Sequence, residues 1–122
     1  MFERLNASAV IDTATALERL GNDLSLYRRV LVHAQVFLGD WLNGFHGARR
    51  LGQADQAGRM VHDLKGIAAT IGARALSDAA RDLEQAMRGG AAGPEVDALT
   101  DPLQQHLRAT VLALAQAFET EG

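Results

Sequence analysis

One histidine of this chain has neighbours that suit phosphoryl chemistry. In the run His62-Asp63-Leu64-Lys65-Gly66, the only lysine of the sequence follows a histidine by three residues and precedes a glycine. Residues three and four positions apart share one face of a helix, so Lys65 and Gly66 would lie beside His62. An exposed imidazole is largely neutral at pH 7, because the ordinary pKa of histidine is about 6.5, and its lone pair can attack phosphorus. We therefore predict that His62 can carry a phosphoryl group.

The other residues on this helix face are charged or small. They are Asp55, Gly58, Arg59, Lys65, Gly66 and Ala69. We expect His62 to point outward, unpaired and without a partner base, because the bulky apolar residues lie on the opposite side. Lys65 and Arg59 would neutralise part of the charge of about −2 that a phosphoryl group brings. Gly66 costs the helix about 1 kcal/mol relative to alanine, which we interpret as clearance above the imidazole.

Glycine and proline divide the sequence into five predicted helices. We expect them at about residues 10–20, 23–50, 54–71, 74–88 and 95–119, with residues 1–9 loose. Pro102 falls inside the last segment, where the helix would either kink or restart with Asp101 as its cap. Short connections make neighbouring helices antiparallel. The predicted fold is therefore all-α: an up-and-down antiparallel four-helix bundle with a short extra N-terminal helix.

The composition narrows the class of function. At 122 residues the chain suffices for one domain, residues 1–122, and its formal net charge of −3 gives no support to nucleic-acid binding. The absence of cysteine excludes disulfides and thiolate metal sites. No run approaches the roughly 18 apolar residues of a membrane span, and the first residues lack the apolar core of a signal peptide. We expect a cytoplasmic monomer without membrane contact or a metal site.

The run from His62 to Ala73, HDLKGIAATIGA, resembles the signature of histidine-containing phosphotransfer (HPt) domains, commonly His-x-Leu-Lys-Gly-Ser-Ala-x-x-Ile-Gly-Ala. Ile67 stands where that family commonly has a small residue. Leu76, Ala79, Ala80, Leu83 and Glu84 are similar to its Leu-x-x-x-Ala-x-x-Leu-Glu helix. Residues 16–23, with Leu26 and Tyr27, resemble the segment that often precedes such a module in a hybrid sensor kinase. The resemblance covers about residues 10–118.

The resemblance implies a helical bundle and assigns roles to three residues. His62 would be the phosphoacceptor, Lys65 the cation near the phosphoryl oxygens and Gly66 the clearance position. Members of the family pass phosphoryl groups to and from an aspartate of a receiver domain in a phosphorelay, and they lack kinase activity. The sequence has no glycine-rich phosphate loop and no acidic cluster for Mg²⁺. We therefore expect a phosphocarrier that is not an enzyme, binds no cofactor and relies on the Mg²⁺ of its receiver partner.

Helix geometry also predicts a docking surface. Counting the rise of about 1.5 Å per residue back from the turn near Gly52 puts residue 62 level with about 42, and from Gly72 level with about 82. We expect Leu42 on one flank of His62, and Arg81, Glu84 and Gln85 on the other. The remaining docking residues would be Asp55, Gly58, Arg59 and Ala69. Each position is also compatible with the edge of the core or with solvated surface.

Two other functions stay open at this point. His62-Asp63-Leu64-Lys65 also resembles the His-Glu-Leu-Arg box of sensor kinases, so the chain could be a kinase dimerisation and phosphoacceptor fragment. That box normally continues Thr-Pro, whereas this chain continues Gly66-Ile67. The second alternative is a non-signalling helical interaction module with four incidental histidines. His33, His46 and His106 already fit an incidental role, since they lie at stripe edges or frayed helix ends.

Overall fold

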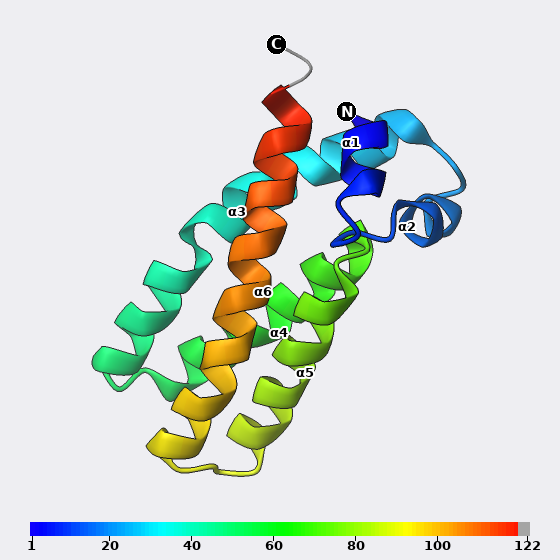
Figure 1. The fold of residues 1–122 in the computed structure, drawn as a ribbon. Helices are drawn as coiled ribbons and strands as arrows, with labels where there is room; N and C mark the ends of the chain where they lie inside the picture. Colours follow the sequence, from blue (N-terminus) through cyan, green and yellow to red (C-terminus); the bar gives the residue numbers. More distant parts are fainter. Residues whose placement is uncertain (120–122) are drawn as a thin grey trace.

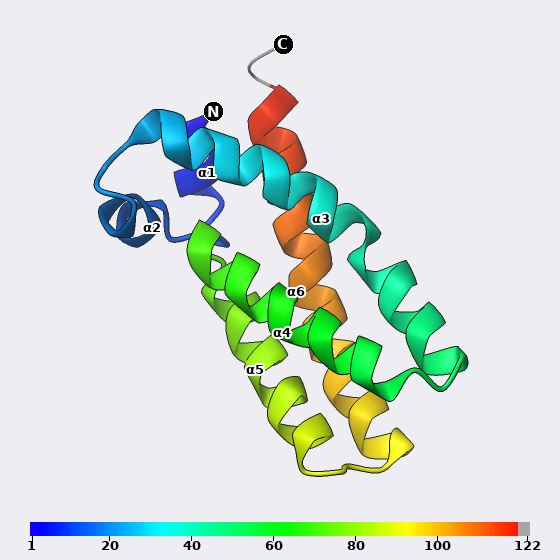
Figure 2. The same cartoon turned by 180° about the vertical axis from the view of Figure 1, so that it is seen from behind.

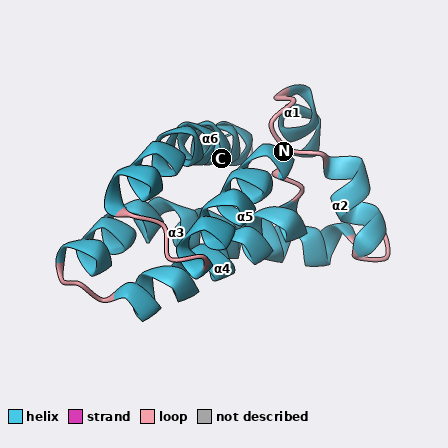
Figure 3. Cartoon of the chain, turned by 90° about the horizontal axis from the view of Figure 1, so that it is seen from below, coloured by secondary structure: helices cyan, strands magenta, loops and turns pink. Residues whose placement is uncertain are grey.

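The computed structural model describes residues 1–119, which form six helices and no strand. The helices are α1 (Phe2–Ala7), α2 (Thr13–Arg19), α3 (Leu24–Arg50), α4 (Ala54–Ile71), α5 (Arg74–Arg88) and α6 (Gly93–Glu119). Figure 3 shows that short loops join them. Over the described part of the chain, no helix is both long and apolar enough to cross a bilayer. The prediction of an all-α fold is confirmed.

The four long helices form an antiparallel bundle (Figure 1). In sequence order around the bundle, α3 packs on α4, α4 on α5, α5 on α6, and α6 back on α3. Arg49 near the end of α3 pairs with Asp97 near the start of α6, so these two helices run in opposite directions. Each helix contributes one apolar face to a common core. The largest fully buried side chains there include Leu31, Leu38, Phe45, Val61, Leu64, Leu83, Leu103 and Leu114.

The prediction that residues 1–9 are loose is wrong. They include α1, whose Leu5 is fully buried and whose Phe2 ring stacks on Tyr27 at 5.8 Å between centroids. Arg4 also donates to the main-chain carbonyl of Gln116, at 3.0 Å. Figures 1 and 2 place α1 and α2 together at one end of the bundle, with α1 beside the last turns of α6. Tertiary contacts of this kind stabilise a helix that is too short to form alone.

The first predicted helix, expected from residue 10, begins at Thr13 as α2, and the segment before it is fixed to α4. Asp12 caps α2 by accepting from the amide of Thr15 at 3.1 Å, and its own amide donates to the carbonyl of Gly72 at 2.8 Å. Gly72 ends α4 with a left-handed φ of 89°, and a Cβ there would overlap the carbonyl of Asp12. Glycine is required there on both counts.

Tyr27 of α3 provides a second anchor for the end of α4. Its hydroxyl donates to the carbonyl of Ile71 at 2.8 Å within the core, and burial raises the pKa of Tyr27 to about 12. The last turn of α4 is therefore held by both α3 and the segment before α2. The helix that carries His62 is fixed at its C-terminal end.

Pro102 does not begin a new helix. α6 starts at Gly93, two residues before the predicted position, and continues through Pro102 to Glu119. Proline removes one hydrogen bond from a helix interior, at a cost of about 3 kcal/mol. Leu99 and Leu103 on either side of it both pack on the core, as Leu107 does one turn further on. We infer that their burial holds the helix together across the proline.

Candidate functional site

His62 lies midway along α4 on the face opposite the core. Its side chain is 58% exposed, whereas Val61 and Leu64 on the inner face are fully buried. The apolar residues of α4 recur every three or four positions, and packing them leaves His62 on the outside. The outward direction expected from the sequence is therefore present.

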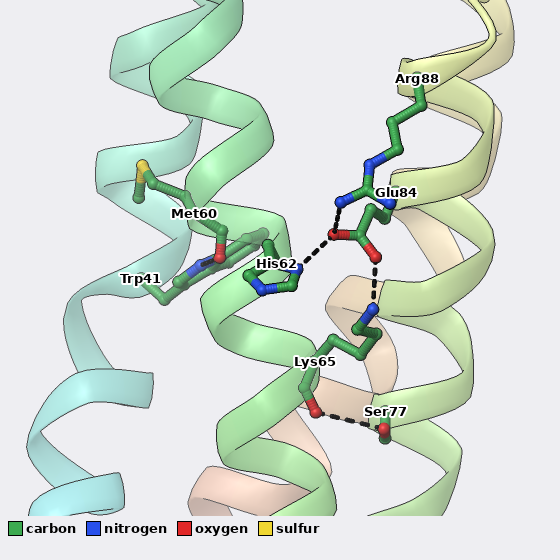
Figure 4. A network of polar contacts seen from close by, with 7 residues as sticks. All are labelled: Trp41, Met60, His62, Lys65, Ser77, Glu84 and Arg88. Carbon is green, nitrogen blue, oxygen red and sulfur yellow. Dashed lines mark hydrogen bonds and ion pairs between the residues drawn. The ribbon is translucent and has the colours of Figure 1, made fainter.

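The expectation that His62 is unpaired is wrong. Its Nδ1 atom lies 2.7 Å from Oε2 of Glu84, which reaches across from α5 (Figure 4). Glu84 is only 4% exposed. Its Oε1 atom also pairs with Nζ of Lys65 at 2.6 Å, and its Oε2 atom pairs with Nη2 of Arg88 at 3.2 Å. A buried carboxylate is stable only when such donors satisfy it. His62, Lys65, Glu84 and Arg88 therefore form one network, which we call the Glu84 cluster.

The charge of Glu84 determines which nitrogen of His62 is free. The hydrogen bond from Lys65 lowers the pKa of Glu84, burial opposes this, and His62 and Arg88 lower it further. The carboxylate is thus ionised at neutral pH and acts only as an acceptor. Nδ1 of His62 must then carry the hydrogen, which leaves the lone pair of the neutral ring on Nε2. Nε2 is turned away from Glu84 (Figure 4).

Neighbouring helices fix α4 on both sides of His62. From α3, the Trp41 indole donates to the carbonyl of Met60 at 2.8 Å, and the backbone at Gly44 leaves space for the Met60 side chain. From α5, the Ser77 hydroxyl donates to the carbonyl of Lys65 at 3.2 Å. Figure 4 shows His62 between these two supports. The stretch of α4 that carries His62 is therefore bonded to both neighbouring helices.

A hollow of about 620 Å³ opens beside His62 between α4 and α5. Asp55, Gly58 and Arg59, which the sequence placed near His62, line it together with Met87 and Arg88 of α5. Arg59 donates to Gln56 on its own helix at 2.9 Å. Among residues 1–119, no group of three or more acidic or histidine side chains is arranged to hold a metal ion.

Several predicted docking residues lie elsewhere. Leu42 lines a groove between α3 and α6 with Leu107 and Val111, because counting helical rise gives the level of a residue but not its side of the helix. Trp41 takes the position facing α4. Glu84 does lie beside His62 as expected and lines the hollow, but it is buried and bonded within the Glu84 cluster.

The other three candidates remain outside the hollow. Ala69 is half-buried, Gln85 is exposed on α5, and neither lines the hollow. Arg81 pairs with Asp78 of its own helix at 3.1 Å. None of the hydrogen bonds and ion pairs among the described residues joins these three residues to the imidazole.

Sequence reasoning missed the bond from Glu84 to His62 and the presence of Arg88. A signal was available, because Glu84 directly follows the buried Leu83 and lies one turn after the buried Ala80 on the apolar face of α5. An acid at such a position requires cations nearby. Arg88 at i+4 is one of them.

Replacing Glu84 by glutamine tests the charge of the cluster. We expect Glu84→Gln to lower the free energy of unfolding at neutral pH by about 1–3 kcal/mol, since bonds to a charged acceptor are lost. Because the folded pKa of Glu84 is lowered, its stabilising effect is complete above the ordinary glutamate pKa of about 4.3 and disappears as the pH falls through the folded pKa. Denaturant unfolding at several pH values measures this.

The exposed acid Asp82 on the same helix provides the control, as Asp82→Asn. The difference between wild type and Glu84→Gln should shrink towards acid pH. A difference that stays constant from neutral to acid pH would contradict the ionised cluster.

Comparisons with known proteins give one match. A family model described as the Hpt domain matches residues 7–117. Searches of curated proteins and of solved structures give no match. Hpt domains are phosphocarriers and not kinases, and they take part in histidine phosphotransfer in phosphorelays. The chain belongs to the Hpt domain family.

Proposed function

We propose that this chain is a phosphocarrier that accepts a phosphoryl group on Nε2 of His62 from the aspartate of one receiver domain and passes it to another. The bond between His62 Nδ1 and Glu84 at 2.7 Å is the observation that supports this most directly. It leaves Nε2 with a lone pair on a side chain that is 58% exposed. Such a nitrogen is accessible to a phosphoryl donor on a second protein.

The transfer needs no base to remove a proton. The lone pair of Nε2 attacks phosphorus, the P–N bond forms, and the bond from phosphorus to the aspartyl oxygen breaks. The aspartate leaves with that electron pair as a carboxylate. The proton on Nδ1 stays between the ring and Glu84, whose negative charge stabilises the positive charge that develops on the imidazole. Transfer to the next receiver is the reverse of this step.

We propose that the receiver supplies the aspartate and the Mg²⁺ that neutralises the phosphoryl oxygens. The open surface around His62 supports docking of such a partner. Asp55, Gly58 and Arg59 surround the hollow beside the imidazole, and a Cβ added at Gly66 would meet no atom within 4 Å. We further propose that the carrier acts as a monomer in the cytoplasm.

Removing the nucleophile provides the first test. We expect His62→Gln to accept no label from a phosphorylated receiver domain, because glutamine has no nucleophilic ring nitrogen. His106→Gln, which removes an exposed histidine of α6, should be labelled like wild type. Label transfer is measured on gels after mixing the purified chain with a panel of phosphorylated receivers.

Two results would contradict the carrier function. Equal labelling of His62→Gln and wild type would indicate a non-signalling helical module or another acceptor residue. Strong self-labelling of the pure chain with ATP and Mg²⁺ alone would instead support the kinase-fragment alternative.

Replacing Gly66 by alanine separates the access of a partner to His62 from the stability of the fold. The glycine has open space around it, so Gly66→Ala should raise the free energy of unfolding by about 1 kcal/mol through helix propensity. It should nevertheless slow phosphotransfer by about tenfold, because a methyl group one turn from His62 displaces the partner. Thermal unfolding and the rate of label transfer measure the two effects.

Gly39→Ala is the matched control. Gly39 also has no neighbour within 4 Å of an added Cβ, but it lines the groove between α3 and α6. It should gain similar stability without slowing transfer. Equal transfer rates in Gly66→Ala and Gly39→Ala would exclude a clearance role for Gly66.

A further inference from the structure

The Glu84 cluster contains more positive charge than Glu84 needs. One carboxylate binds two permanent cations, Lys65 and Arg88, in addition to the N–H of His62. Phosphorylation of His62 would add a charge of about −2 next to this cluster. Lys65 lies one turn along α4 from His62, so it is the cation placed to neutralise part of that charge. In the unphosphorylated chain, however, Glu84 already holds its ammonium group at 2.6 Å.

We propose that Arg88 is a positioning residue that keeps Glu84 neutralised while Lys65 moves from Glu84 to the phosphoryl group. The idea rests on the proposed function of His62. Glu84 is 4% exposed, so a carboxylate deprived of both cations would be strongly unfavourable. With Arg88 in place, Lys65 can leave without exposing a bare buried charge.

The two oxygens of Glu84 separate the roles of the cations. Lys65 binds Oε1, whereas Arg88 and His62 share Oε2. Lys65 can therefore depart while the contacts that orient the imidazole remain. Figure 4 shows Arg88 reaching Glu84 along α5 from above, whereas Lys65 reaches it from α4 below.

Arg88 is poorly placed to bind the phosphoryl group itself. It meets the oxygen that also accepts from Nδ1, and Nε2 lies on the other side of the ring. Its side chain is 70% exposed, so its charge can remain partly hydrated while it holds Glu84. The arrangement assigns Lys65 to the phosphate and Arg88 to the carboxylate.

The single lysine of the sequence makes the exchange measurable. In protein labelled with ¹⁵N-lysine, the only side-chain ammonium signal belongs to Lys65. The small donor phosphoramidate can phosphorylate His62, as its P–N bond breaks and ammonia leaves. We expect the Lys65 signal to shift when His62 is phosphorylated in wild type. In Arg88→Gln the shift should fall by about threefold or more, since Glu84 then retains Lys65.

Two variants separate the exchange from general effects of losing an arginine. Arg88→Lys should restore the shift, because it keeps a cation on Glu84. Arg81→Gln removes an exposed arginine of the same helix that pairs with Asp78, and it should behave like wild type. Phosphorus NMR and mass spectrometry confirm the extent of phosphorylation in each sample.

The outcomes distinguish this proposal from the proposed function. A phosphorylated His62 with an unmoved Lys65 signal, or an equal shift in Arg88→Gln and wild type, would overturn the exchange alone. Label transfer from receivers would still stand in that case. A wild-type chain whose His62 does not react would overturn both.

Discussion

A carboxylate buried between two helices has to be satisfied by donors from the helix that it faces, and Glu84 of α5 imposes this condition on α4. At 4% exposure, its charge is tolerable only because Lys65 and His62 of α4 and Arg88 of α5 donate to it. The same contacts set the register of the two helices and the orientation of the imidazole. The nitrogen of His62 that we propose as the nucleophile is thus left free by the way in which a buried charge is neutralised.

The inner side of α4 packs against the bundle, and its outer side is exposed to solvent. Gly72 and Tyr27 fix the end of the helix, and Trp41 binds its middle through the carbonyl of Met60. On the outer side, Gly58 and Gly66 lie one turn before and after His62, and an added Cβ would meet nothing at either position. A helix anchored on one side and open on the other suits the proposed reaction of His62 with an electrophile on another protein.

The sequence predicted those helices whose apolar residues recur with a helical period. It did not predict features whose formation depends on tertiary contacts. The four long helices lie within two residues of the expected bounds, because their apolar stripes are long and glycine marks their ends. α1 was missed, since six residues carry no usable period and its stability comes from contacts such as that of Phe2 with Tyr27. Helical spacing placed His62 outward and Glu84 on its flank, but it did not show that these two side chains bond, or on which side of α3 Leu42 lies.

The protonation of the His62 ring in the free protein tests the central claim most directly. Long-range ¹H–¹⁵N NMR distinguishes the two neutral tautomers of histidine, and the missing signal in His62→Gln assigns the residue among four histidines. Glu84 is expected to hold His62 as the Nδ1–H tautomer, with Nε2 unprotonated at a pH where the ring is neutral. A ring that carries its hydrogen on Nε2, or an equal mixture of both tautomers, would contradict this account.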